Sequence, residues 1–118
     1  MTSYMFREPE FPLLIETESG VLGAMNGRNL ESVISKSNFS SKNHFSIIDS
    51  SCEGWSYYPE VDAISPLAID KKWSKKKMIA FYNSFVTDVE ANGFVGKSLS
   101  SKRVSKVIEE IIAFANQP

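Results

Sequence analysis

The sequence FPLLIETESGVLGAM, residues 11–25, decides the fold class. Its apolar parts, Phe11–Glu16 and Val21–Met25, flank the turn sequence Thr17–Gly20. Two short apolar runs around such a turn are typical of antiparallel strands. The turn dipeptide Asn26-Gly27 then ends the second run. We therefore expect a β-hairpin over this stretch.

More short strands and one helix are expected before residue 70. Leu30, Val33 and Ile34 have helical spacing, which predicts a short helix from about Asn29, a residue that favours the N-cap. Residues 1–10 are expected to be an irregular lead-in. Other apolar groups predict three further strands, around Phe45–Ile48, around Trp55–Tyr58, and within 61–64 or 64–69.

The C-terminal third predicts two amphipathic helices. The first has Ser74 as its expected N-cap and Asn92-Gly93 as its expected end. The second has Ser100 or Ser101 as its expected N-cap. Its apolar stripe is unbroken and consists of Val104, Val107, Ile108, Ile111, Ile112 and Ala115. Because both helices must bury an apolar stripe, the expected fold is α+β. It has a small antiparallel sheet, one short N-terminal helix, and two C-terminal amphipathic helices packed on one face.

Composition limits the class of protein. The chain has 118 residues, 42% hydrophobic, with a net charge of −1, which favours a single domain over 1–118. No apolar run of about 18 residues suggests a membrane span. The N-terminus does not resemble a secretory signal. Cys52 is the only cysteine, so an internal disulfide and a cysteine-based zinc site are excluded. A lone thiol suits a reducing compartment, and we expect a cytoplasmic protein.

Charge is distributed unevenly between the two halves. Residues 1–64 contain nine acidic and four basic side chains, a net charge of −5. Residues 65–118 contain five acidic and nine basic side chains, a net charge of +4. This asymmetry indicates a partner of definite charge, although ordinary solvated surface would give the same count.

Residues that could carry a reaction are few. His44 is the only histidine and lies in no nucleophile motif, so we expect no catalytic residue, metal site or cofactor. The segment 48–59 instead combines two acids, Asp49 and Glu53, with three aromatic residues. Acids in turns usually stabilise the turn itself. Aromatic residues with a polar group are typical of protein-binding surfaces, although Trp55 and Tyr57 are also expected in the core.

A lysine-rich cluster over residues 71–77 favours a different function. Its five lysines surround Trp73, whose indole could stack on a base while the ammonium groups neutralise phosphates. Alternatively, Trp73 packs as a hydrophobic staple onto the following helix. The sequence pI of about 5.8 disfavours a dedicated nucleic-acid-binding protein.

Several segments together carry a family resemblance. They are 11–24, 48–59, Ile64-Ser-Pro-Leu, Lys72-Trp-Ser-Lys-Lys and Leu99-Ser-Ser-Lys-Arg-Val. In this order, the chain from Phe11 to Ala113 resembles the small immunity proteins of bacterial contact-dependent growth inhibition systems.

The resemblance implies a cytoplasmic inhibitor, not an enzyme, that binds and neutralises the C-terminal toxin domain of its cognate effector. Such toxins are often nucleases, frequently acting on tRNA, with basic clefts that carboxylates can block. Charge and expected exposure then favour seven toxin-binding residues, Glu16, Glu18, Asp49, Glu53, Tyr58, Glu60 and Asp62. No membrane or direct nucleic-acid partner is expected. The alternatives are an accessory nucleic-acid-binding protein using Lys71–Lys77, and a small hydrolase built around His44.

Overall fold

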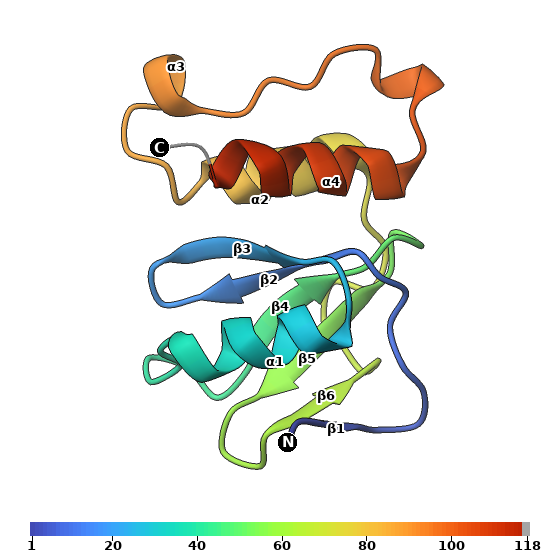
Figure 1. The fold of residues 1–118 in the computed structure, drawn as a ribbon, viewed down its shortest axis with the longest axis vertical. Helices are drawn as coiled ribbons and strands as arrows, with labels where there is room; N and C mark the ends of the chain where they lie inside the picture. The colour runs from blue at the N-terminus through green and yellow to red at the C-terminus, as the bar shows by residue number, and fades with distance from the viewer. Residues whose placement is uncertain (117–118) are drawn as a thin grey trace.

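The computed structural model describes residues 1–116 and contains one six-stranded sheet with helices on both faces (Figure 1). The strands are β1 (Ser3–Tyr4), β2 (Leu13–Thr17), β3 (Gly20–Ala24), β4 (Phe45–Ile48), β5 (Gly54–Tyr58) and β6 (Ala63–Ser65). The helices are α1 (Gly27–Lys36), α2 (Lys75–Asn83), α3 (Val89–Asn92), the 3-10 helix η1 (Leu99–Ser101) and α4 (Val104–Ala115). The expected α+β class is confirmed.

The sheet has the order β1-β6-β5-β4-β2-β3. Every neighbouring pair is antiparallel except β1 and β6, which are parallel. The predicted hairpin is confirmed as β2 and β3, with Thr17 paired to Gly20. The lead-in 1–10 was expected to be irregular, but it includes β1, which pairs with a strand about 60 residues later.

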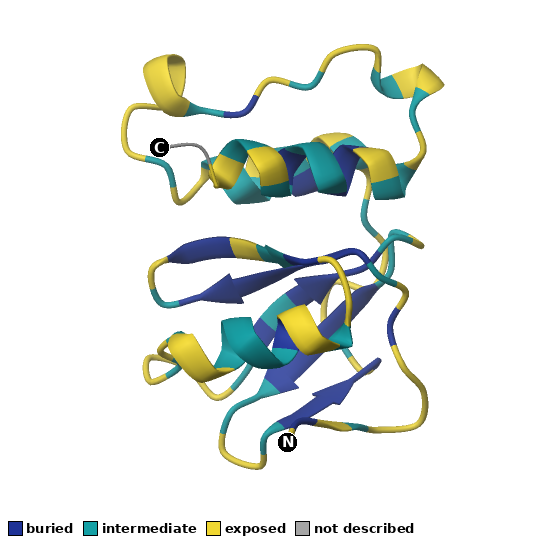
Figure 2. Cartoon of the chain, in the orientation of Figure 1, coloured by how far each residue is buried: buried dark blue, intermediate teal, exposed yellow. Residues whose placement is uncertain are grey.

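Alternation along the strands gives the sheet two apolar faces, visible as buried strands in Figure 2. One face packs against α1; its buried cluster is Leu13, Ile15, Ala24, Leu30, Ile47, Trp55, Tyr57 and Ile64. The other packs against α2 and α4; its buried cluster is Leu14, Val21, Ile48, Met78, Phe94, Val107, Ile108 and Ile111. The two C-terminal helices therefore share one face, and α1 covers the opposite one.

Helix α1 begins earlier than the sequence predicted. Asn26 is its N-cap, because the Asn26 side chain accepts from the Asn29 amide at 2.9 Å. The Asn29 side chain in turn accepts from the Met25 amide. The prediction of Asn29 as N-cap was wrong, since the Asn26-Gly27 pair starts the helix directly instead of forming a separate turn.

Helix α2 is shorter than predicted, and the prediction that it continues to Asn92 was wrong. The Asn83 side chain donates to the Phe94 carbonyl at 3.0 Å and accepts from the Phe94 amide at 2.8 Å. This pair of bonds joins the end of α2 to the chain after α3, so the chain turns back between them. Residues 89–92 form α3 as a separate single turn.

The start of α4 also differs from the prediction. Ser100 and Ser101 belong to η1, and neither caps α4. The N-cap position is Arg103, which makes no side-chain capping bond. The apolar stripe of α4 nevertheless lies as predicted, with three of its residues fully buried. Within residues 1–116, no helix has the length and apolar character that crossing a membrane requires.

Candidate interaction surface

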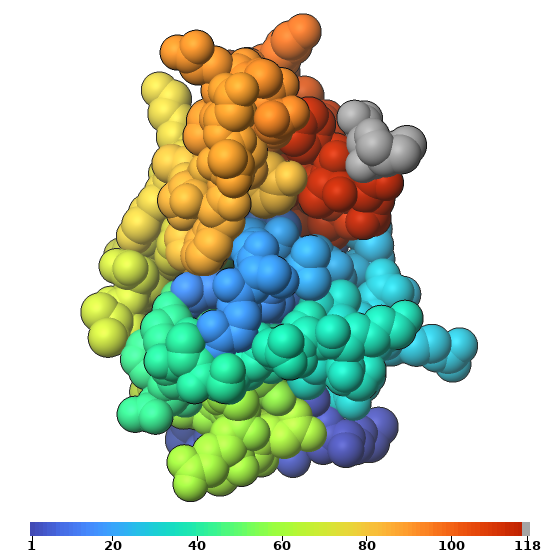
Figure 3. All heavy atoms as spheres, turned by 90° about the vertical axis from the view of Figure 1, so that its left-hand side faces the viewer, coloured from blue at the N-terminus to red at the C-terminus, as the bar shows by residue number. Residues whose placement is uncertain are grey.

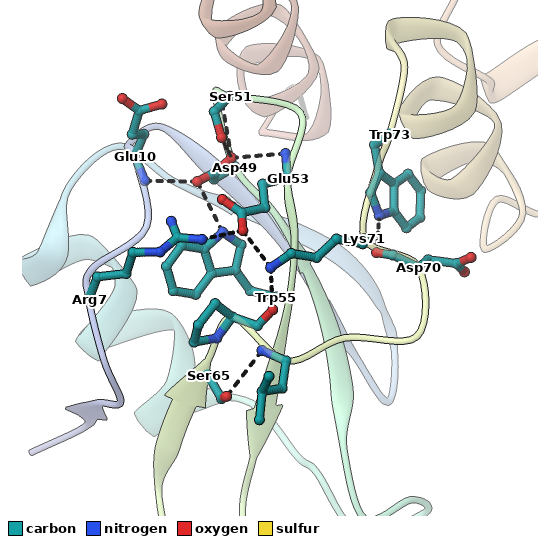
Figure 4. A network of polar contacts seen from close by, with 12 residues as sticks. Arg7, Glu10, Asp49, Ser51, Glu53, Trp55, Ser65, Asp70, Lys71 and Trp73 are labelled. Carbon is teal, nitrogen blue, oxygen red and sulfur yellow. Dashed lines mark hydrogen bonds and ion pairs between the residues drawn. The ribbon is translucent and has the colours of Figure 1, made fainter.

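The turn between β4 and β5 is organised by one buried carboxylate, Asp49, which is 1% exposed. Its Oδ1 accepts from the Ser51 amide, the Ser51 hydroxyl and the Glu53 amide, at 2.9, 2.6 and 3.1 Å. Its Oδ2 accepts from the Glu10 amide and the Trp55 indole, each at 3.0 Å (Figure 4). Asp49 therefore stabilises its own turn and fastens the N-terminal segment to it.

Glu53 joins two segments that are distant in sequence. Arg7 and Lys71 approach its carboxylate from opposite sides, and both form ion pairs with it (Figure 4). The Arg7 guanidinium also lies 4.7 Å from the centroid of the Trp55 ring. The hydrogen bond from Arg7 is the largest influence holding the pKa of Glu53 below its ordinary value. The pairs fix residues 5–10 and 66–71 at this end of the sheet.

The first of these segments presents an exposed aromatic side chain, Phe6. Its backbone φ is +72°, and the Arg7 amide donates to the Met5 carbonyl at 2.9 Å, which makes Phe6 the centre of a γ-turn. The Met5 amide donates to the Ile64 carbonyl, so both sides of the turn are held. Phe6 is 78% exposed. A bulky residue at this φ lowers the stability of the fold by about 1–3 kcal/mol. Because the Phe6 ring is exposed, no burial of the ring offsets this loss.

Phe6→Gly is expected to raise the free energy of unfolding by about 1 kcal/mol, because glycine adopts a positive φ without a steric penalty. Phe6→Ala is the control: alanine removes the same exposed ring but keeps a Cβ at the unfavourable φ, so no gain is expected. Urea denaturation of the two variants and the parent protein measures the difference. Equal stabilities for the glycine and alanine variants would contradict the assignment of strain to Phe6.

The predicted acidic residues of the hairpin have internal partners. Glu16 is 7% exposed; it pairs with Lys42 and accepts from the Ser46 amide at 3.0 Å. Glu18 accepts from the amides of Ser40 and Ser41. These bonds hold the loop after α1 beside the hairpin, and Figure 3 shows the two segments side by side. Hydrogen bonds from this loop lower the pKa of Glu18.

The remaining predicted residues lie near the turn between β5 and β6. Asp62 accepts from the Thr2 hydroxyl and the Tyr57 hydroxyl, both at 2.8 Å. Burial, followed by the bond to Asp62, raises the pKa of Tyr57. Tyr58 is half-buried, with its ring 6.1 Å from that of His44. Glu60 is exposed.

The structure thus brings only Asp49 and Glu53 of the seven predicted residues into one network. Five of the six carboxylates bind groups of this chain that hold the fold together, and they are Glu16, Glu18, Asp49, Glu53 and Asp62. A role of the seven residues in toxin binding stays a prediction. The sequence analysis did not single out Phe6 and Arg7. Their only signal is an aromatic and a basic residue within the segment 1–10, which was expected to be irregular.

The lysine-rich cluster also makes internal contacts. Trp73 packs onto α2, with its ring 5.2 Å from that of Phe81, and its indole donates to the Asp70 carbonyl at 3.0 Å. This arrangement agrees with the alternative that Trp73 packs onto the following helix, although its ring partner is Phe81, one turn beyond the position of a hydrophobic staple. The Lys77 ammonium lies 4.4 Å from the Trp73 ring centroid, and Lys75 donates to two backbone carbonyls. The indole is therefore occupied by contacts within the protein.

Comparison of the chain with family models, curated proteins and solved structures found no match. In the part of the chain that the structure describes, no three His, Cys, Asp or Glu side chains are grouped as metal ligands would be.

Proposed function

We propose that this chain is a cytoplasmic immunity protein that binds and neutralises the toxin domain of a contact-dependent growth inhibition effector. The proposed partner is a nuclease domain, the complex is a heterodimer, and this chain supplies no catalytic group. The order of segments from Phe11 to Ala113 supports the family. The structural observation that carries the proposal is the display of Phe6.

An aromatic side chain that is held at an unfavourable backbone angle and left in solvent fits a protein-binding anchor. Aromatic anchors supply much of the binding energy of protein interfaces when a partner covers them. Phe6 is presented by a segment fixed through Arg7 and Glu53, so little conformational entropy is lost when it is buried. Leu67 and Ile69, the latter 87% exposed, lie on the second fixed segment and add apolar area.

Exposed carboxylates flank this anchor. Glu8 and Glu10 are both exposed and lie two and four positions after Phe6. Only the Glu10 backbone takes part in the Asp49 network, and in Figure 4 its carboxylate points away from the network. These two acids are better placed than Asp49 or Glu16 to meet a basic nuclease cleft, because neither carboxylate forms an ion pair within residues 1–116. Complementary charge of this kind speeds association.

The test is binding to the toxin domain encoded immediately upstream of this chain. We expect a 1:1 complex by titration calorimetry, and Phe6→Ala is expected to weaken it by roughly 10- to 100-fold, the range of an aromatic anchor. Val95→Ala is the matched control, because Val95 is 74% exposed but lies beyond α3, in the helical layer. Its affinity is expected to stay within about twofold of the parent, since lone exposed apolar residues carry little binding energy.

Two results would count against this function. One is the absence of a complex when both proteins are present at micromolar concentration. The other is a complex whose toxin keeps full nuclease activity, because an immunity protein must inhibit as well as bind.

A further inference from the structure

A pocket of about 480 Å³ lies next to the Asp49 turn. It is formed where the β4–β5 turn, the start of α2, η1 and the start of α4 meet, and these segments share one side of the molecule in Figure 1. Its lining includes Cys52, Ser74, Lys75, Lys76, Leu99 and Val104. Leu99, Val104 and the lysine methylene chains make the wall predominantly apolar.

The charged side chains that line this pocket are two lysines, Lys75 and Lys76. Lys75 donates to the backbone carbonyls of Leu99 and Lys102 and forms no ion pair with a carboxylate among residues 1–116. Lys76 is exposed, and Arg103 is exposed directly before Val104. The acid of the adjoining turn, Asp49, is buried and already accepts five hydrogen bonds. Among residues 1–116, neither these two lysines nor the neighbouring Arg103 forms an ion pair, so an apolar group of a partner with carboxylates next to it would complement the pocket.

The pocket is linked through Glu53 to the segment that displays Phe6. Cys52 in its wall is followed by Glu53, and Glu53 binds Arg7, the residue after Phe6. In Figure 1 the segment between β1 and β2 runs along the same side of the molecule as the elements that form the pocket, so one partner can cover both. Because the pocket is open to solvent, a side chain of the partner can enter it without any rearrangement of the helices.

Resting on the proposed function, we propose that this pocket receives an apolar side chain of the toxin domain that is flanked by carboxylates. The apolar side chain occupies the space beside Leu99 and Val104, and its neighbouring carboxylates pair with Lys76 and Arg103. The toxin is then held at two places, at the Phe6 anchor and at this pocket.

Cys52 reports directly on occupancy of the pocket, because it is the only cysteine and lies in the wall. Burial raises the pKa of the Cys52 thiol, so alkylation by iodoacetamide is followed at about pH 8.5 or above, where thiolate forms. Intact-mass spectrometry measures the labelling rate of this chain with and without the toxin domain. We expect the complex to slow the rate at least tenfold. As control, Ser35→Cys in a Cys52→Ser background places an exposed thiol on α1, across the sheet, and its rate is expected to be unchanged.

Two variants test the same pocket without the thiol. Val104→Trp fills it and is expected to weaken toxin binding at least tenfold, whereas Val95→Trp adds the same ring outside it and leaves binding unchanged. Lys76→Glu reverses a rim charge and is expected to weaken binding most at low salt. Lys36→Glu, on α1, is its control. Circular dichroism is used to check that each variant is folded. If Val104→Trp does not fold, Lys76→Glu alone tests the pocket.

The outcomes separate this inference from the function it rests on. A toxin complex in which Cys52 reacts at its free rate, and Val104→Trp or Lys76→Glu binds normally, overturns the inference and leaves the function intact. The absence of any toxin complex overturns both. Protection of Cys52 by dodecanoate, with none from the toxin domain, also overturns the inference and assigns the pocket to a small amphipathic anion.

Discussion

Gly54→Ala is expected to destabilise the protein by more than about 4 kcal/mol, a loss that a chain of this size rarely tolerates. A Cβ at Gly54 would lie 1.8 Å from the Asp70 backbone oxygen and 2.9 Å from the Trp73 indole nitrogen. The chain at 70–73 cannot move aside cheaply, because the Gly54 amide donates to the Lys71 carbonyl at 2.7 Å and the Trp73 amide to the Cys52 carbonyl at 2.8 Å. Urea denaturation or soluble yield measures the effect.

Gly27→Ala is the matched control for this substitution. A Cβ at Gly27 would meet only the Tyr4 hydroxyl, at 3.8 Å, and Gly27 is the first residue of α1. Alanine favours the helix over glycine, so this variant is expected to be as stable as the parent or up to about 1 kcal/mol more stable. Similar stabilities for the two alanine variants would show that the segment 70–73 is not packed against β5 as described.

Asp49→Ala is expected to lower the free energy of unfolding by about 3–5 kcal/mol, as for other buried charged groups whose partners lose their acceptor. Five donors lose their acceptor together, and the Trp55 indole among them is buried away from solvent. The N-terminal segment also loses its bond at Glu10. Chemical denaturation followed by tryptophan fluorescence measures the loss.

Two further variants test whether the cost arises from these bonds. Asp49→Asn keeps one carbonyl oxygen as acceptor, so its loss is expected to lie between zero and that of alanine. Glu60→Ala removes an exposed carboxylate and is expected to change stability by no more than about 0.5 kcal/mol. If Asp49→Ala were as mild as Glu60→Ala, the carboxylate would not organise the turn.

Elements that depend on neighbouring residues were predictable from the sequence. The hairpin of β2 and β3 follows from two apolar runs around a turn, and the buried stripe of α4 follows from helical spacing. The packing of Trp73 onto α2 was one of two alternatives that the sequence offered, and it depends on Phe81, only eight positions away. In each case the determining contacts lie within about fifteen residues.

Features that depend on distant residues were not predictable. The end of α2 at Asn83 is set by bonds to Phe94, and β1 exists only because β6 lies beside it. The sequence of α2 continues with apolar residues at helical spacing, so periodicity alone extended the helix too far. Local patterns carry no information on which remote segment supplies a hydrogen-bond partner.

The candidate surface was the least predictable part. A count of acidic residues cannot distinguish an exposed carboxylate from one bound to a lysine or an amide of the same chain, as Glu16 and Asp49 are. Phe6 carries no sequence signal of its positive φ, which arises from the bonds of the residues on either side of it. Only the tertiary contacts reveal which carboxylates are bound within the chain and that Phe6 is held in an exposed position.

The division of the core into two clusters has a consequence for synthesis on the ribosome. Every member of the cluster around α1 lies between residues 4 and 64, so the sheet and α1 can assemble as soon as that length has emerged. The second face must wait for α4, which begins at Val104, and meanwhile leaves Leu14, Val21 and Ile48 uncovered. A nascent chain in this state exposes an apolar face of the sheet. It is most prone to aggregation at this stage, when binding by a chaperone would protect it.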